Sequence, residues 1–245
     1  MSQRYFSEMP ITTDSIRLEG AEAHHLLHVM RAEQGTEVVV FDGRGAEYKA
    51  KVSRVGRGLV DLHIVQRLDI DRELPLRISL GVALPKGERQ RWLTAKAVEL
   101  GVARMVPLIT RHGVAQPTAT ALDRLRRAVV ESSKQCGRNR LTEICSPEPF
   151  PAFVGQAPRD AIRLVADPRG DCSWPTIARE RLQKAGSVVL AVGPEGGFAE
   201  DELTVATTAG WFAVDLGPRI LRVETAAIAL VALAAFTAGH DLDSA

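Results

Sequence analysis

Two glycine-rich segments near the C-terminus hold the residue types best suited to binding a small ligand. Residues 193–198 read GPEGGF and directly follow the apolar run 188–192. Glycines let a backbone approach a ligand closely, and open α/β sheets bind ligands at the carboxyl ends of their strands. Three acidic residues, 200–202, open the next helix and would repel a phosphate there. The first segment therefore suits a cationic or neutral ligand.

The same segment lacks the signatures of two common nucleotide sites. No Gly-Lys-Ser/Thr ending is present, and the GxGxxG spacing of a dinucleotide site is missing. A ligand with a sulfonium cation, or a neutral adenosine, is compatible with the neighbouring carboxylates. Taken alone, the loop also fits an ordinary tight turn.

The second segment, residues 216–225, reads LGPRILRVET and joins an apolar strand to an alanine-rich helix. Its Gly-Pro pair forces a turn, and Glu224 or Thr225 can cap the helix by accepting hydrogen bonds from exposed backbone N–H groups. Charged side chains flank the apolar Ile220 and Leu221. This mixture suits a ligand with an apolar adenine and a polar amino-acid end.

The elements that must position these segments fall into two groups. The first seventy residues predict strands over 37–41, 47–55 and 59–65 with a turn at 42–45, preceded by a short helix over 21–31. A charged stretch ending in proline, residues 69–75, marks a boundary. We therefore expect a small strand-rich domain over residues 1–72 and a second domain over 73–245.

From residue 76 the apolar pattern alternates between strands and helices. The predicted strands are 76–84, 105–109, a short one around Ile144, 162–166, 187–192 and 212–216; the predicted helices are 89–100, 122–136, 176–184, one opened by the acidic residues 200–202, and the alanine-rich final helix. Such alternation favours an α/β fold with a mostly parallel sheet covered by helices.

Composition narrows the class of protein. The 245 residues are 45% hydrophobic and 25% charged, which is typical of a folded globular chain, and the net charge of +1 does not by itself indicate a polyanionic partner. Three cysteines are too few for a disulfide framework or a four-ligand zinc site, which favours free thiols in a reducing cytoplasm. The longest apolar stretch, 225–238, is shorter than the about 20 residues that span a bilayer. We expect no membrane segment and no metal.

The sequences of the two segments, GPEGGF and LGPRILRVETA, resemble the C-terminal signature of the RsmE family. Members of this family are the 16S ribosomal RNA uridine N3-methyltransferases of the SPOUT superfamily. The resemblance continues through 86–102 (KGERQRWLTAKAVELGV), 107–113 (PLITRHG) and 133–138 (SKQCGR), and reaches 24–31 (HHLLHVMR) and 41–43 (FDG). It covers nearly the whole chain. Val223 stands where some members carry threonine.

The resemblance implies a C-terminal SPOUT domain with a deep trefoil knot, in which S-adenosylmethionine (SAM) is held among the knot loops. It also implies a homodimer with active sites near the interface, and an N-terminal PUA-like β-barrel that helps to hold ribosomal RNA. By motif, the expected cofactor-binding residues are Leu190, Gly193, Glu195, Gly196, Gly197, Leu216, Ile220, Leu221, Arg222 and Thr225.

The implied reaction has chemical requirements that single out two residues. Uridine N3 carries a proton, so it becomes a nucleophile only when a base removes that proton and a cation stabilises the charge on the flanking carbonyl oxygens. Glu224 is the candidate base, or orients one, and Arg222 is the candidate cation. The alternative interpretation makes Glu224 a helix cap with Arg222 as its salt-bridge partner.

Basic residues outside the two segments are the candidates for RNA contact. Lysine and arginine bind phosphate oxygens, and such binding weakens as salt rises. The candidates are Arg4, Arg31, Lys86, Arg89, Arg111 and Arg138. Three histidines at 24, 25 and 28 share a predicted helix, where packing or RNA contact is favoured over metal binding.

Two other classes of function stay open at this point. Alternating strands and helices also occur in dehydrogenases, although the dinucleotide fingerprint is missing. A non-enzymatic RNA-binding or ribosome-assembly protein would explain the basic clusters. The pattern does not distinguish naked 16S RNA from the assembled small subunit as substrate.

Overall fold

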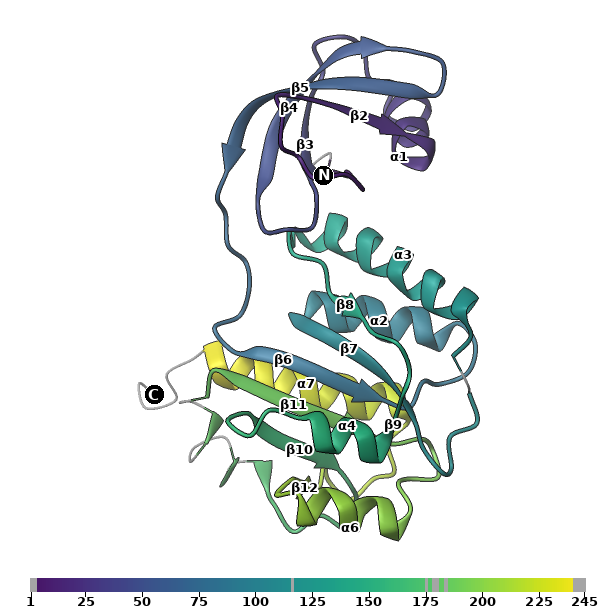
Figure 1. Cartoon of the computed structure of the whole chain (residues 1–245), viewed down its shortest axis with the longest axis vertical. Helices are drawn as coiled ribbons and strands as arrows, with labels where there is room; N and C mark the ends of the chain where they lie inside the picture. Colours follow the sequence, from purple (N-terminus) through teal and green to yellow (C-terminus); the bar gives the residue numbers. More distant parts are fainter. Residues whose placement is uncertain (1–3, 116, 175, 178–180, 183–184, 240–245) are drawn as a thin grey trace. The chain divides into compact units, whose positions relative to one another are not determined.

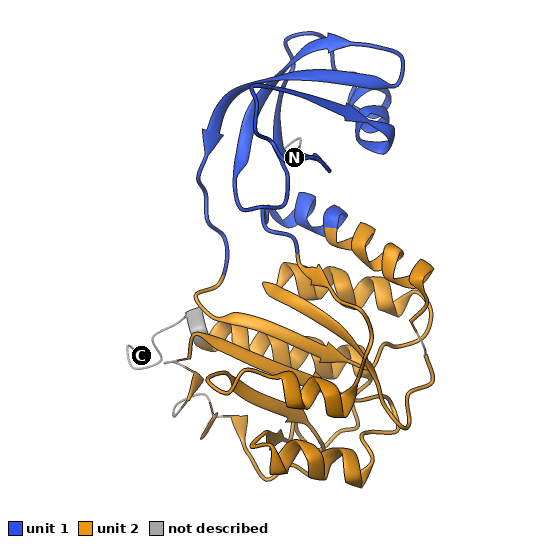
Figure 2. Cartoon of the chain, viewed as in Figure 1, with its two compact units in different colours: residues 1–73, 130–141 blue, residues 74–129, 142–245 orange. Residues whose placement is uncertain are grey.

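The computed structural model describes residues 4–115, 117–174, 176–177, 181–182 and 185–239. The chain divides into two compact units, Met1–Glu73 with Val130–Leu141 (unit 1) and Leu74–Val129 with Thr142–Ala245 (unit 2), coloured in Figure 2. The division falls within helix α3 (Ala119–Cys136), so the last part of this helix belongs to unit 1. The sequence predicted an uninterrupted first domain because packing between remote segments leaves no local pattern.

A five-stranded sheet with the order β1-β3-β4-β5-β2 forms the framework of unit 1. The strands are β1 (Arg4–Phe6), β2 (Ser15–Glu19), β3 (Glu37–Phe41), β4 (Glu47–Val55) and β5 (Leu59–Leu68). β1 is parallel to β3, and the other pairs are antiparallel. The three strands expected from the sequence are β3 to β5. The strands β1, of three residues, and β2, of five, were not expected from the sequence.

The helical part of unit 1 begins with α1 (Gly20–His24), which continues directly into the π-helix η1 (His25–Val29). The sequence predicted a single helix here. Leu26 of η1 is fully buried in the core of the unit together with Tyr5 and Leu62. Arg31 follows with a φ of 53°, in the left-handed region where a helix cannot continue.

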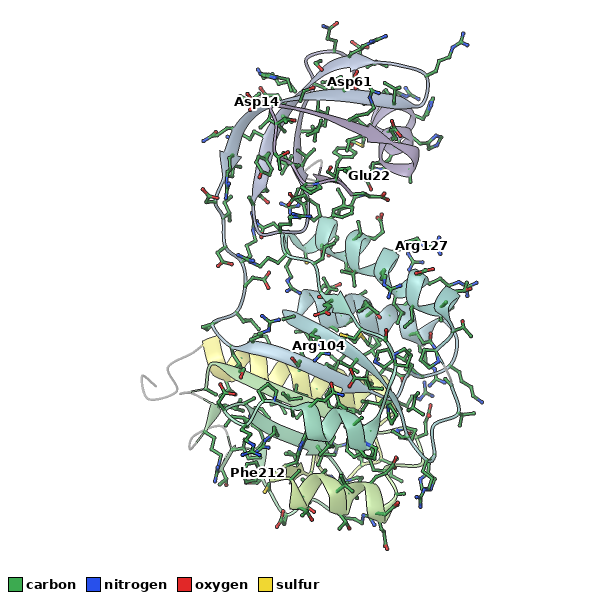
Figure 3. All side chains as sticks on the ribbon, viewed as in Figure 1. Asp14, Glu22, Asp61, Arg104, Arg127 and Phe212 are labelled. Atoms are coloured by element: carbon green, nitrogen blue, oxygen red, sulfur yellow. The ribbon has the colours of Figure 1, made fainter. Side chains whose placement is uncertain are left out.

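Residues 130–141 pack against the sheet and the first helix of unit 1. Lys134 Nζ donates to a carboxylate oxygen of Glu22, labelled in Figure 3, at 2.7 Å. The Leu141 N–H donates to the Gly43 carbonyl at 3.2 Å, and Gly43 has a φ of 78°. A Cβ at Gly43 would lie 2.7 Å from the Leu141 side chain, so the close approach needs glycine.

Unit 2 is built on a sheet with the order β12-β10-β11-β6-β7-β8, and β9 pairs with β7. The strands are β6 (Arg77–Val82), β7 (Val102–Ile109), β8 (Glu143–Ile144), β9 (Glu148–Pro149), β10 (Ile162–Ala166), β11 (Ser187–Val192) and β12 (Phe212–Val214). All of these pairings are parallel. The predicted α/β fold with a mostly parallel sheet is confirmed. Strand order does not test the trefoil knot, which stays a prediction.

Helices cover the sheet of unit 2. Figure 1 shows α7 (Val223–Gly239) behind the sheet, where it packs on α2 (Arg89–Glu99), and α4 (Phe150–Gln156) in front, where it packs on α6 (Glu200–Thr208). The sequence did not predict α4, because prolines suggest a loop there, yet proline is tolerated in the first helical turn.

Two further expectations concern helices. The helix expected over 176–184 falls mostly on residues outside those described. Among the described helices, none combines the length and apolar character needed to cross a membrane.

Candidate active site

A pocket in unit 2 lies at the carboxyl ends of three adjacent parallel strands, β10, β11 and β12. Their last residues, Ala166, Val192 and Val214, are in register across the sheet, and all three line the pocket. The loops that follow the strands form the rest of the wall. Both glycine-rich segments therefore meet at one edge of the sheet, where α/β folds bind ligands.

The first segment supplies a tight loop after β11. Gly193, Pro194, Glu195 and Gly197 line the pocket. Gly193 is buried, and a Cβ there would lie 3.0 Å from the Phe198 ring. Gly197 has a φ of 71°, and its N–H donates to the Pro194 carbonyl at 2.8 Å. Two of the glycines are thus required by the shape of the loop.

The second segment also lines the pocket. Leu216, Ile220 and Leu221, three of the residues expected to bind a cofactor, are among the lining residues. Ile220 is 91% exposed, an apolar side chain open to solvent beside the pocket. Gly217 adopts a φ of 106° and donates its N–H to a carboxylate oxygen of Asp215 at 2.9 Å. This turn directs the chain from β12 toward α7.

A third segment, which was not expected from the sequence, also lines the pocket. Asp167 and Pro168 follow β10 and line the pocket between the other two loops. Asp167 is buried, and its carboxylate accepts from the Arg169 backbone N–H at 2.7 Å and from Arg169 Nε at 3.2 Å. The available signal was an acidic residue directly after the predicted strand 162–166. Only the pairing of β10 with β11 and β12 shows that this strand end belongs to the site.

Four of the residues expected to bind a cofactor do not line the pocket. Leu190 is fully buried within β11. Gly196 is exposed, and a Cβ there would lie 3.3 Å from His112 Cβ, so its small size serves loop packing. Arg222 and Thr225 are exposed. Each of the four lies within two residues of a lining residue, and their contact with a cofactor stays a prediction.

Glu224 is a buried charged residue that directly follows Val223, which lines the pocket. It is the second residue of α7 and its side chain is only 7% exposed. One carboxylate oxygen accepts from Arg89 Nη1 at 3.3 Å, whereas the other, Oε2, is buried without a hydrogen-bond partner among the described residues. From the sequence, Arg222 was one candidate for the salt-bridge partner of Glu224. The structure pairs Glu224 with Arg89 of α2 instead.

Two of the expected RNA contacts need correction. The Arg4 guanidinium forms an ion pair with Glu47 and lies 4.8 Å from the centre of the Phe41 ring. Arg138 pairs with Glu73 at 2.5 Å. Both arginine side chains are 5% exposed, so neither presents its charge to a phosphate. They pair with carboxylates within unit 1, the buried Glu47 and the partly buried Glu73.

Three of the other four basic candidates are open to solvent, whereas Arg89 is half-buried. Arg31 in unit 1 and Lys86 in unit 2 are exposed. Arg111, also in unit 2, is exposed and forms an ion pair with Asp201 at 2.6 Å. Such an exposed pair contributes little to stability and leaves the guanidinium accessible to a phosphate.

No cluster of three or more histidine, cysteine, aspartate or glutamate side chains is placed to hold a metal ion in the part of the chain that the structure describes. The His24 and His28 rings lie 4.7 Å apart, and the His25 ring packs 5.8 Å from that of Tyr5. These distances are typical of aromatic rings that pack against each other, which is one of the two roles favoured for these histidines from the sequence.

The pocket residues fit SAM. Apolar side chains of Val192, Val214 and Leu221 suit an adenine ring. Glu195 is half-exposed at the pocket and offers a carboxylate to a sulfonium or ammonium group, and Arg219 offers a cation to a carboxylate. The pocket thus combines apolar walls with the carboxylates of Asp167, Glu195 and Asp215 and the cation of Arg219.

Comparison with known proteins decides the family. The family model of an RNA methyltransferase domain matches residues 72–235, and that of an RNA methyltransferase PUA domain matches residues 18–65. The Mycobacterium bovis ribosomal RNA small subunit methyltransferase E is 32% identical to this chain, covering 97% of it and 92% of the relative. The chain belongs to the ribosomal RNA small subunit methyltransferase E family.

Solved structures of the methyltransferase E family and its relatives have the same fold. A putative methyltransferase from Legionella pneumophila, in complex with SAM, has a TM-score of 0.87 at 31% identity, covering 96% of this chain and 97% of the other. The ribosomal RNA small subunit methyltransferase E from Neisseria gonorrhoeae, bound to SAM, has a TM-score of 0.86 at 28% identity, covering 95% and 96%.

Proposed function

We propose that this chain is a SAM-dependent enzyme that methylates N3 of a uridine in the 16S RNA of the small ribosomal subunit. The observation that supports this most directly is the pocket at the ends of β10, β11 and β12, which is lined by both signature segments. Family membership and the SAM-bound relatives support the cofactor. The choice of uridine N3 rests on the resemblance of the signature segments to their family.

Cofactor binding would rely on both loops. We assign the contacts to the pocket-lining members of the motif set, which are Gly193, Glu195, Gly197, Leu216, Ile220 and Leu221. Backbone groups of the first loop and the apolar side chains of the second would hold the adenosyl part, with Glu195 toward the positive charge. When bound, SAM supplies the methyl group, and the electrons of its carbon–sulfur bond leave with sulfur. The transfer needs no metal.

Glu224 and Arg222 are the proposed catalytic residues. Glu224 Oε2 is a buried oxygen without a partner among the described residues, so it is suited to accept the N3 proton as N3 attacks the methyl carbon. Arg222 is exposed two residues earlier and would stabilise the negative charge that spreads onto the uridine carbonyl oxygens.

RNA contact is proposed for Arg31 in unit 1 and for Lys86 and Arg111 in unit 2, because these side chains are exposed. Their affinity for RNA should fall as salt rises, since phosphate contacts release counterions. The substrate is naked 16S RNA or the assembled small subunit, which places the enzyme in the cytoplasm.

We also propose a homodimer, formed by the outer surface of α2 and α7. Trp92 of α2 is 50% exposed and Leu233 of α7 is 37% exposed, although the two helices pack together. α7 contains no charged residue after Glu224 within its bounds. Apolar side chains exposed on a nearly uncharged helix indicate a protein interface.

The test is transfer of a labelled methyl group from SAM to small-subunit RNA, offered naked and as assembled subunits, followed by mass mapping of the product. We expect one N3-methyluridine from one of the two substrates. Binding of the RNA without methyl transfer would instead support a non-enzymatic RNA-binding protein. A calorimetric titration with NAD and SAM separates a dehydrogenase from a methyltransferase.

A further inference from the structure

Arg89 forms ion pairs with both Glu195, in the loop over residues 193–198, and Glu224. Its Nη1 atom lies 3.3 Å from Glu224 Oε1 and 3.9 Å from Glu195 Oε1. Arg89 is the first residue of α2, Glu195 lies in the loop after β11, and Glu224 lies in the first turn of α7. One guanidinium therefore joins three segments around the pocket.

The two carboxylates differ in their need for this cation. The Glu195 side chain is 52% exposed, so water solvates it, whereas the Glu224 side chain is 7% exposed. A buried carboxylate without a partner is costly, and Arg89 is the cation bound to it among the described residues. Arg89 covers only Oε1, whereas Oε2 is buried and has no hydrogen-bond donor among the described residues.

We propose that Arg89 is a positioning residue for the methyl transfer: it fixes Glu224 through Oε1 so that Oε2 faces the substrate and accepts the N3 proton. This inference rests on the proposed function. It changes the role that the sequence suggested for Arg89, which was contact with an RNA phosphate. With two carboxylates within 3.9 Å, the Arg89 guanidinium is surrounded by negative charge that disfavours a phosphate.

The role predicts a specific kinetic pattern for Arg89→Ala. A positioning residue changes kcat, so kcat should fall at least about tenfold, while the KM for RNA and the affinity for SAM change by less than about twofold. Arg91→Ala is the matched control, because Arg91 is an exposed arginine two residues along the same helix, and it should leave kcat unchanged.

A double-mutant cycle separates positioning from a general loss of structure. Glu224→Gln should lower kcat, and Arg89→Ala combined with Glu224→Gln should be no slower than Glu224→Gln alone, within about twofold, because Arg89 acts only through Glu224. Arg89→Lys keeps the charge and should give a kcat between those of the wild type and Arg89→Ala. Arg89→Lys also provides the measurement if Arg89→Ala does not fold.

Three outcomes overturn the inference. The first is a higher KM for RNA with kcat retained in Arg89→Ala, which would assign Arg89 to phosphate contact. The second is additive losses in the double variant. The third is loss of SAM affinity in Glu224→Gln, measured by calorimetry, which would assign Oε2 to the cofactor. A wild-type chain that transfers no methyl group overturns the proposed function and this inference with it, whereas an active wild type with an equally active Arg89→Ala variant overturns this inference alone.

Discussion

The buried carboxylate of Glu202 accepts a hydrogen bond from the backbone N–H of Arg111 at 3.0 Å, across 91 residues of sequence. Its second oxygen accepts from the Ala199 N–H at 2.9 Å. Glu202 lies in the first turn of α6, and Arg111 follows β7. Ala199 directly follows the loop over residues 193–198. One side chain thus fixes the loop after β7 to the loop that lines the pocket.

Glu202→Ala should therefore weaken both stability and cofactor binding. The substitution leaves two backbone N–H groups without their charged acceptor, which costs about 1.5–3 kcal/mol of unfolding free energy. SAM affinity should fall because the loop over 193–198 loses its anchor. Denaturant unfolding and calorimetric titration measure the two effects. The matched control is Glu200→Ala in the same helical turn, where the side chain is 92% exposed and little change is expected. Equal SAM affinity in both variants would contradict this prediction.

Gly197→Ala should lower SAM affinity without unfolding the chain. Gly197 has a φ of 71°, where a Cβ costs about 1–2 kcal/mol, and no atom lies within 4 Å of the added carbon. Relief of this strain changes the loop at the pocket, so the dissociation constant should rise about tenfold. Gly155→Ala, in α4 with open space around it and no positive φ, is the control and should bind SAM as the wild type does. An unchanged dissociation constant in Gly197→Ala would show that the loop adapts.

Glu47 should make unit 1 sensitive to acid. Burial raises the pKa of Glu47, but hydrogen bonds from Arg72 and Arg4, with the charges of both, outweigh burial and hold the pKa below its usual value. The folded state therefore favours the ionised carboxylate. Its stabilisation is complete above the unfolded pKa of about 4.3 and is lost as pH falls through the lowered folded pKa.

The measurement is the unfolding free energy between pH 7 and pH 3 for the wild type and Glu47→Gln. At pH 7 the variant should be less stable by about 3 kcal/mol, because Arg4 stays buried without its carboxylate. The difference should shrink below about pH 4.3. Glu37→Gln is the control, since the Glu37 side chain is 75% exposed in its pair with Lys51. A difference that does not depend on pH would refute the assigned role of Glu47.

Leu233→Glu should convert the proposed dimer to a monomer. The added carboxylate would be buried in an apolar interface without a cation, which opposes association. Analytical ultracentrifugation measures the change in mass. Val205→Glu on α6 is the control, because Val205 is similarly exposed at 41% but lies outside the proposed interface. A wild-type chain that sediments as a monomer would end the dimer proposal.

Local patterns predicted much of unit 2. The strand over 187–192 was expected with the bounds that β11 has, because an uninterrupted apolar run between polar residues is typical of a buried parallel strand. The helix expected over 89–100 is α2, apart from its last residue. The prediction failed where a proline-rich stretch forms α4 and at β1, which has only three residues. It also overlooked β2, whose five residues SIRLE alternate between polar and apolar.

The candidate site was predicted only in part, for a related reason. The two signature segments were found because each is continuous in sequence and each follows a strand. Asp167 was missed because its place in the pocket depends on β10 lying between β11 and β12. The order of strands in a sheet cannot be predicted from the residues of a single segment. Arg4 and Arg138 were expected to meet RNA because both are charged, but the fold buries both beside carboxylates.

By itself, the sequence determined the class of fold, the two candidate ligand-binding segments and the family, because these depend on periodicity and on residues that are neighbours along the chain. Only the tertiary structure decided which partner each charged group has. Arg89 and Glu224 lie 135 residues apart, and their pairing follows from the packing of α2 on α7. A salt bridge depends on distance and burial in three dimensions, and neither quantity is fixed by residue type or by spacing along the chain.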